Sequence, residues 1–174
     1  LVTANNGMGN ISLRIGVGDG TFTTPATERF SAGAGPYDIS LGDIDADGKL
    51  DVVVANDGSN NVSLLINTSP TFKAAVSTAT AGNRPQGLVL ADFNGDQKLD
   101  FATADSNGNS VTIRLNNGTG GFGALGSTIM NVSAPNYLVA GDFDGNGKID
   151  LAQAEAIADL IAAIGQFAAE LDRA

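Results

Sequence analysis

The sequence repeats with a period of about 50 residues, and this repeat limits the possible folds more than any other feature. Three acidic stretches begin at Asp43, Asp92 and Asp142, so successive copies are 49 and 50 residues apart. A proline lies seven residues before each acidic stretch, with a strand-like segment between the two. Such a chain builds its core by packing similar units against one another.

The two ends of the chain carry incomplete copies of the repeat. The segment LVTANNGMGNISLRIGVGDGTF, from Leu1, matches DVVVANDGSNNVSLLINTSPTF, from Asp51, in the middle of the first full copy. The third copy, APNYLVAGDFDGNGKIDLA from Ala134, contains only the first half of the pattern. The N-terminus therefore supplies the second half of one repeat, and the C-terminus supplies the first half of another.

The second copy shows what one repeat contains. Alternating apolar and polar residues, β-branched residues and Asn/Gly/Asp turns predict four strands, near Gln86–Ala91, Leu99–Ala104, Ser110–Asn116 and Phe122–Met130. Four strands in 40–50 residues are typical of a propeller blade. We therefore expect an all-β fold with about three four-stranded β-propeller blades in residues 1–150. The ring would be incomplete, because propellers have about four to eight blades; a parallel solenoid is the alternative.

Each acidic stretch is a nine-residue loop with oxygen-bearing side chains at positions 1, 3, 5 and 9, counted from its first Asp. Position 7 is always lysine, which can offer a cation only its backbone carbonyl, and position 8 is aliphatic. Clustered carboxylates repel one another unless positive charge lies between them. The candidate metal ligands are Asp43, Asp45, Asp47, Lys49, Asp51, Asp92, Asn94, Asp96, Lys98, Asp100, Asp142, Asp144, Asn146, Lys148 and Asp150.

Calcium is the cation that fits this pattern best. It takes six to eight oxygen ligands and tolerates irregular geometry, whereas Mg²⁺ demands a tighter octahedron. Zn²⁺ prefers His and Cys, and the sequence contains neither. We expect about three Ca²⁺ sites, one in each loop. Simple Asx turns are the alternative interpretation of the same residues.

The three loops, the GAGP before the first of them, and the GDGTF and GTGGFG segments resemble the FG-GAP or VCBS-type repeats of calcium-binding β-propellers. The resemblance covers residues 1–151. It implies that each loop joins the first two strands of a blade, and that Asp43, Asp45, Asp47, Asp51 and their counterparts bind the metal. Asn94 and Asn146 replace Asp in the pattern, which lowers the negative charge of those two sites.

Composition excludes several classes of function. A formal net charge of −10 argues against a nucleic-acid partner, because phosphates require a basic surface. No apolar run is long enough to span a membrane. Without His or Cys, the usual catalytic arrangements around a nucleophile cannot form, so we expect no enzyme activity. Tyr37 and Tyr137, which follow repeat prolines, could stack on a sugar or cover a blade end.

Residues 151–174 depart from the repeat. The alanine-rich segment from Leu151 has apolar residues at helical spacing, and Asp150 could cap a helix there. We expect a C-terminal amphipathic α-helix that is separate from the repeat domain of residues 1–150. Its apolar stripe must pack on its own blades or on another chain. Two chains together could supply six blades, the helix could cap an exposed edge strand, or the sequence could be a piece of a longer chain.

These observations predict a secreted or cell-surface β-propeller module that binds calcium and acts as a recognition or adhesion scaffold. Its ligand would be a protein or a glycan. A lectin-like carbohydrate-binding propeller, and the non-catalytic repeat region of a larger secreted enzyme, are the alternatives.

Overall fold

The computed structural model describes residues 1–23, 28–69, 71–73, 76–79 and 82–154. This part of the chain contains thirteen strands and one short 3-10 turn, η1. Their bounds are β1 Val2–Asn5, η1 Asn6–Met8, β2 Asn10–Leu13, β3 Glu28–Ser31, β4 Pro36–Gly42, β5 Asp51–Asn56, β6 Asn61–Leu65, β7 Val76–Ala79, β8 Pro85–Ala91, β9 Asp100–Asp105, β10 Ser110–Asn116, β11 Phe122–Met130, β12 Tyr137–Gly141 and β13 Asp150–Ala154.

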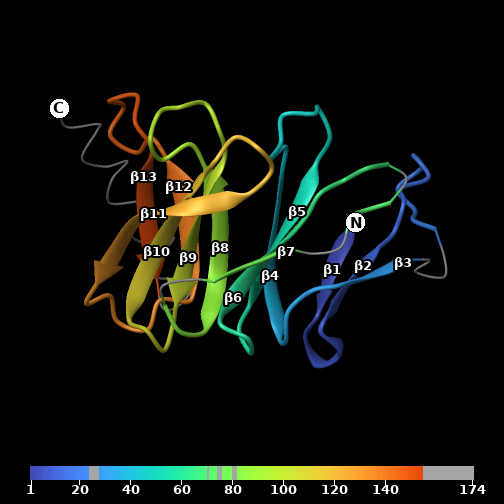
Figure 1. Ribbon diagram of the computed structural model, residues 1–174, viewed down its shortest axis with the longest axis horizontal. Helices are drawn as coiled ribbons and strands as arrows, with labels where there is room; N and C mark the ends of the chain where they lie inside the picture. Colours follow the sequence, from blue (N-terminus) through green and yellow to red (C-terminus); the bar gives the residue numbers. More distant parts are fainter. Residues whose placement is uncertain (24–27, 70, 74–75, 80–81, 155–174) are drawn as a thin grey trace.

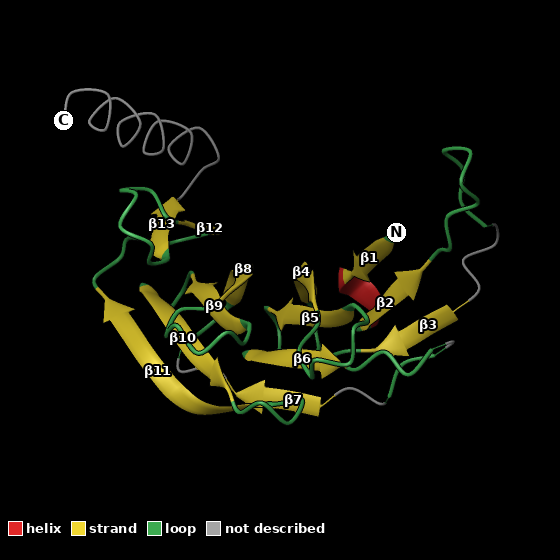
Figure 2. Cartoon of the chain, turned by 90° about the horizontal axis from the view of Figure 1, so that it is seen from above, coloured by secondary structure: helices red, strands yellow, loops and turns green. Residues whose placement is uncertain are grey.

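The strands form four antiparallel sheets in which each strand pairs with its neighbours in sequence. Two sheets have four strands, in the orders β4-β5-β6-β7 and β8-β9-β10-β11. A three-stranded sheet, β1-β2-β3, precedes them, and a two-stranded sheet, β12-β13, follows them. Figure 2 shows the sheets side by side along an open arc, with β4 and β8 on its inner side and β7 and β11 on its outer side. The arrangement resembles that of propeller blades, although the described sheets do not close into a ring.

The four strands expected in the second repeat are confirmed as β8 to β11, with bounds that differ by at most one residue. The end of the repeat region differs from the expectation. The predicted helix was to begin at Leu151, but Asp150–Ala154 forms β13, which pairs with β12 in register from Gly141↔Asp150 to Tyr137↔Ala154. The third loop therefore leads into a strand, as the first two loops do. Residues 155–174, where the rest of the helix was expected, lie outside the described residues.

The apolar core lies between neighbouring sheets. Strands β5 and β9 are buried along their whole length, because another sheet packs on each of their faces, so both faces carry core residues. Between the two four-stranded sheets, Val53 and Leu64 pack with Leu88, Phe101 and Phe122. The rings of Phe101 and Phe122 meet edge to face, with centroids 4.7 Å apart.

Direct hydrogen bonds join neighbouring blades along the inner side of the arc. The hydroxyl of Ser40 in β4 donates to the carbonyl of Leu88 in β8 at 2.9 Å. The amide of Leu88 donates to the carboxylate of Asp38 at 2.9 Å. At the start of β8, the Arg84 guanidinium binds the Asp57 carboxylate of the preceding blade through Nε at 2.8 Å and an Nη at 3.0 Å. These contacts fix the position of one blade on the next.

In the first three sheets, a buried or partly buried polar cluster closes the turn after the second strand of the blade pattern. In β5, the Asn56 amide donates to Asn61 Oδ1 at 2.8 Å and to Ser63 Oγ at 2.9 Å. In β1, the Asn5 amide makes the same two contacts with Asn10 and Ser12, both at 2.8 Å. Asn5 therefore corresponds to Asn56. This correspondence corrects the expected alignment of the chain start by one residue, since it sets Leu1 against Val52 and not against Asp51.

An aspartate takes this place in the third cluster. Asp105, at the end of β9, is fully buried and accepts hydrogen bonds from Thr112 Oγ1 at 2.6 Å and Thr103 Oγ1 at 3.0 Å. Burial raises the pKa of Asp105 to about 6, although these hydroxyl groups favour the ionised form. The same location thus donates hydrogen bonds in two blades and accepts them in the third.

Replacing Asp105 with Asn should make the protein more stable at neutral pH. The pKa of this carboxyl is higher in the folded state than its value of about 4 in the unfolded chain, so ionisation favours unfolding. The protonated carboxyl contributes about 2–3 kcal/mol to the free energy of unfolding. This contribution is fully present below pH 4 and is lost as the pH rises to 6. Urea unfolding between pH 4 and pH 7 should show that the free energy of unfolding of Asp105→Asn does not fall in this way as the pH rises.

The matched control is Asp19→Asn, which changes a fully exposed aspartate. It should keep the decline of stability between pH 4 and pH 6 that the unmodified protein shows. If Asp105→Asn and the unmodified protein declined equally, the buried carboxyl would not be the source of the pH dependence.

Candidate metal centre

The three acidic loops join corresponding strands at the same edge of the arc. The first joins β4 to β5, the second joins β8 to β9, and the third joins β12 to β13. In Figure 1 they lie together at the upper edge of the molecule. Each loop therefore connects the first and second strands of its blade, as the resemblance implied.

The first aspartate of each loop shapes the loop by accepting hydrogen bonds from backbone amides. The Asp43 carboxylate accepts from Asp47 N at 3.0 Å and Gly48 N at 2.8 Å. Asp92 accepts from the amides of residues 95, 96 and 97, and Asp142 from those of residues 146 and 147. Gly48 has a φ of +84°, which favours glycine in this tight turn. The first carboxylate thus wraps the chain around itself.

The carboxylates at positions 1, 3 and 9 converge. Asp43, Asp45 and Asp51 each offer an oxygen that lies within 4.8 Å of the oxygens of the other two. Asp142, Asp144 and Asp150 form an equivalent group in the third loop. The second loop has Asn94 at position 3, so its side-chain oxygens at these positions are two carboxylates and one amide. These distances allow a single cation to contact all three side chains of a group.

In the first two loops, the residues at positions 5 and 7 pair with each other. The Lys49 ammonium forms an ion pair with the Asp47 carboxylate, and Lys98 pairs with Asp96 at 2.7 Å. The hydrogen bond from the lysine is the main reason why the pKa values of Asp47 and Asp96 lie below their usual value. Asp47 is not part of the converging group. In these two loops, the lysine at position 7 therefore balances the charge of the aspartate at position 5. The expected role of the lysine backbone carbonyl as a metal ligand stays a prediction.

The aspartate at position 9 has a structural role that the sequence pattern did not reveal. Both oxygens of the buried Asp51 accept backbone hydrogen bonds, from Ile44 N and from Asn67 N, each at 2.8 Å. Asp100 accepts in the same way from Phe93 N at 3.1 Å and Asn116 N at 2.8 Å. Each carboxylate thus joins its own loop to the end of the third strand of the blade.

The asparagines at the third-strand ends are site residues that sequence reasoning missed. Asn67 and Asn116 both follow the position-9 aspartate by 16 residues, and this shared spacing is the signal that could have identified them. The Asn116 side chain also donates to the carbonyls of Ile44 at 2.9 Å and Leu99 at 3.2 Å. It therefore connects the loop of one blade to the next blade.

Burial raises the pKa values of Asp51 and Asp100, and the two backbone donors on each carboxylate oppose this shift. Neighbouring carboxylates raise both values further; Asp45 and Asp47 act in this way on Asp51. The negative charge of the loop is thus held in place at an electrostatic cost. A bound cation would remove part of that cost.

The Asp45 side chain gives the clearest indication of a ligand. Its Oδ1 is buried, and no described group donates a hydrogen bond to it. The turn after β10 covers this carboxylate, since a Cβ atom on Gly120 would lie only 3.2 Å from Asp45 Cβ. A buried carboxylate oxygen without a donor is unfavourable unless a cation lies beside it. The oxygen ligands that this loop offers therefore fit a hard cation such as calcium.

The comparison with protein families agrees with this geometry. A model described as FG-GAP-like repeat matches residues 1–54, 43–103 and 92–152. The chain belongs to the FG-GAP-like repeat family. Each of the second and third matches begins at the first Asp of a loop, so the loops identified by ligand spacing are also landmarks of the family pattern.

Among solved structures, this FG-GAP-like chain is similar to a lectin from Agrocybe aegerita whose structure is described as the basis of specific recognition of non-reducing terminal N-acetylglucosamine. The TM-score is 0.54 at 21% sequence identity, and the match covers 88% of this chain. The chain spans about half of that lectin, 46% of its length. The comparison with curated proteins gives no significant match.

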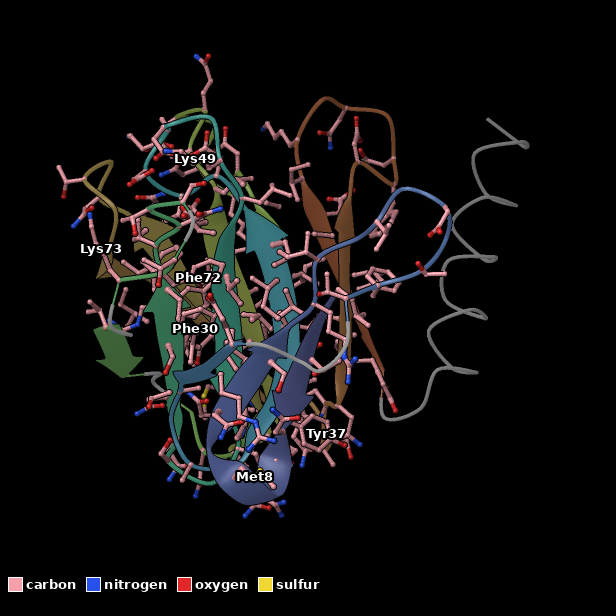
Figure 3. The ribbon with its side chains drawn as sticks, turned by 90° about the vertical axis from the view of Figure 1, so that its right-hand side faces the viewer. Met8, Phe30, Tyr37, Lys49, Phe72 and Lys73 are labelled. Carbon is pink, nitrogen blue, oxygen red and sulfur yellow. The ribbon has the colours of Figure 1, made fainter. Side chains whose placement is uncertain are left out.

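The two tyrosines named as candidate sugar contacts are partly exposed. Tyr37 has 49% of its surface accessible and Tyr137 has 38%. Figure 3 shows Tyr37 near Met8, at the end of the blades opposite Lys49 and the acidic loops. Tyr137 is the first residue of β12, and the third acidic loop follows the other end of that strand. The tyrosines and the converging carboxylates are therefore separate sites. Within the described residues, no helix is both long and apolar enough to cross a membrane.

The position-9 carboxylate should contribute to stability even without metal. Asp100→Asn replaces one acceptor oxygen with an NH₂ group that faces a backbone N–H, leaving a buried donor unsatisfied. We expect a loss of about 1–3 kcal/mol in the free energy of unfolding. Urea unfolding in EDTA isolates this term, because no metal then contributes.

The control is Asp96→Asn in the same loop, which removes one negative charge from a more exposed position. It should change the free energy of unfolding by less than about 0.5 kcal/mol. Equal losses for the two variants would show that charge, and not the bridge between loop and third strand, decides stability.

Proposed function

We propose that the chain is a calcium-binding β-propeller module that acts outside the cell as a recognition or adhesion scaffold. The observation that carries this proposal is the convergence of three carboxylates beside a buried Asp45 oxygen that no described donor satisfies. The chain's membership of the FG-GAP-like family supports it. Calcium prefers such oxygen sets and completes its shell with carbonyls and water.

The role of the ion would be structural. In the first loop it would lie among Asp43, Asp45 and Asp51, with Asp47 and the Lys49 carbonyl as further ligands if the Asp47–Lys49 ion pair opens. The corresponding residues of the second and third loops would hold two more ions. Since Asp51 also binds the end of the third strand, an ion beside it would stabilise three parts of one blade together.

Removing calcium should destabilise the protein. A ligand at 100 times its dissociation constant contributes about 2.7 kcal/mol per site, so we expect EDTA to lower the melting temperature by roughly 5 °C or more. Calorimetry with and without EDTA, combined with metal analysis of the purified protein, measures this effect. An unchanged melt together with no bound calcium would contradict the proposal.

The matched variants are Asp45→Asn, which weakens the first site, and Asp19→Asn, which removes an exposed acid outside the loops. Calcium titration calorimetry should show weakened binding at one site for Asp45→Asn and unchanged binding for Asp19→Asn. An equal reduction in both variants would indicate a general effect of net charge.

Glycan recognition is the second candidate function. The similarity to the Agrocybe aegerita lectin favours it, together with the partly exposed Tyr37 and Tyr137, which lie near the starts of β4 and β12, away from the acidic loops that follow these strands. Aromatic rings at such an edge can stack on the apolar face of a sugar. A glycan ending in N-acetylglucosamine is the first probe to use, because that lectin recognises it.

A glycan array should show saturable binding if this second function holds. Tyr37→Ala should then reduce binding at least tenfold, whereas the control Tyr37→Phe should retain most of it, because stacking needs the ring. Both variants should keep their calcium-dependent melting shift. Absence of binding to every glycan would leave the calcium scaffold as the proposal and exclude the lectin role of this chain.

The parent protein is a further matter. The chain spans 46% of the length of the lectin. The non-catalytic repeat region of a larger secreted enzyme is the remaining alternative. We propose a secreted or cell-surface location because extracellular calcium concentrations suit calcium-binding loops of this kind.

A further inference from the structure

The turn between β10 and β11, residues 117–121, lies between two acidic loops. On one side it meets the first loop, which belongs to the preceding blade: a Cβ atom on Gly120 would lie 3.2 Å from Asp45 Cβ. On the other side it meets the second loop, where a Cβ atom on Gly118 would lie 2.7 Å from Lys98 Cε. Glycine at these two places lets the backbone of the turn fit closely between the loops.

Hydrogen bonds hold this turn in one shape and fasten it to the first loop. Asn117 N donates to the carbonyl of Gly121 at 2.9 Å, and Gly118 N donates to Asn116 Oδ1 at 2.8 Å. The Nδ2 of Asn116 donates in turn to the carbonyl of Ile44, at position 2 of the first loop, at 2.9 Å. The base of the turn is therefore bound to the same loop that Gly120 covers.

The burial of Asp45 comes from this turn and not from its own loop. The corresponding residues of the second and third loops, Asn94 and Asp144, are exposed, although each loop is wrapped around its first aspartate in the same way. Asp45 is only partly exposed, and its Oδ1 is buried with no described donor beside it. Because the next blade shields this oxygen from water, its negative charge is poorly screened and attracts a cation strongly.

We propose that the first calcium site is shared between two blades. The carboxylates of Asp43, Asp45 and Asp51 hold the ion from one blade, and the turn of residues 117–121 from the next blade closes the site over it. The inference rests on the calcium-binding function proposed above and adds a second blade to it. Since the closed turn favours the bound ion, the bound ion favours the closed turn to the same degree. Calcium therefore stabilises the contact between the blades, and the turn slows its release.

Hydrogen exchange with and without calcium tests this sharing, because the exchange of backbone amides reports how often a segment opens. We expect calcium to slow exchange by about tenfold or more in the three acidic loops and also in residues 117–121. The control is the equivalent turn of the first sheet, in which Val17 N donates to Thr21 O as Asn117 N donates to Gly121 O. Exchange in this control turn should not depend on calcium.

The variant Asp45→Asn separates the two ions that would lie on either side of the turn. This substitution weakens the first site and leaves the second loop unchanged. At the lowest calcium concentration that protects the second loop, residues 92–100, calcium should no longer slow exchange in residues 117–121. The second loop thus serves as the control within the same molecule, because its protection shows that the variant is folded and binds calcium there.

A pair of glycine variants measures how the turn affects calcium release. Gly120→Ala and Gly20→Ala place the same side chain at φ values of +76° and +90°, so the backbone strain is similar. Only the first brings a Cβ atom against Asp45, since a Cβ atom on Gly20 would meet nothing within 4 Å. In stopped-flow mixing with a fluorescent calcium chelator, we expect Gly120→Ala to release one ion about tenfold faster than the unmodified protein, and Gly20→Ala to release all ions at the unmodified rates.

Three results would overturn the shared site while leaving the calcium-binding function intact. They are calcium protection confined to the acidic loops, protection of residues 117–121 that survives Asp45→Asn, and equal release rates for the two glycine variants. If calcium protects none of the three loops and the titration detects no binding, the calcium-binding function is wrong, and the shared site is wrong with it.

Discussion

Each complete blade depends on one buried carboxylate that holds together parts of the chain far apart in sequence. Asp51 and Asp100 receive a backbone N–H from their own loop and another from a residue 16 positions later, at the end of the third strand. An ionised group is costly to bury, and these two donors offset much of that cost. The loop therefore has a fixed position relative to the sheet before any cation binds, and the other carboxylates converge around this fixed point.

Contacts between blades follow from the same arrangement. Because the loop is held against its own sheet, Ile44 projects into the space before the next blade and becomes part of the core there. The Asn116 side chain, at the end of a third strand, binds the carbonyl of that same Ile44. Local order within one blade and packing between two blades are therefore one network. A repeat of this kind gains stability mainly from its neighbours, as repeat proteins generally do.

Much of this fold could be predicted from the sequence, because the repeat shows the same information several times. The strands of the second blade were predicted from residue alternation and turn residues, and the resemblance to FG-GAP repeats implied the position of each loop between its first two strands. The continuation after Asp150 was predicted incorrectly. Local propensity favoured a helix from Leu151, but pairing with β12 holds residues 150–154 in a strand. Local preference gave way to a partner that only the tertiary structure reveals.

The sequence predicted which residue types make up the candidate site, but not the different role of each loop position. Spacing identified the carboxylates at positions 1, 3 and 9, which do converge, yet it treated position 5 as their equal. The ion pairs of Lys49 and Lys98 depend on side-chain direction, which a pattern of residue types does not contain. The second role of position 9 depends on Asn67 and Asn116, whose contribution through their backbone amides is invisible in residue identity.

The polar cluster at the turn after the second strand can give individual repeats of one chain different properties. Asn56 donates hydrogen bonds where Asp105 accepts them, and the neighbouring hydroxyl groups of Ser63 and Thr112 can rotate to serve either case. Asparagine and aspartate codons differ by a single base. One mutation can therefore give a single blade its own response to acidity while its shape is preserved, so blades that look alike in outline can open under different conditions.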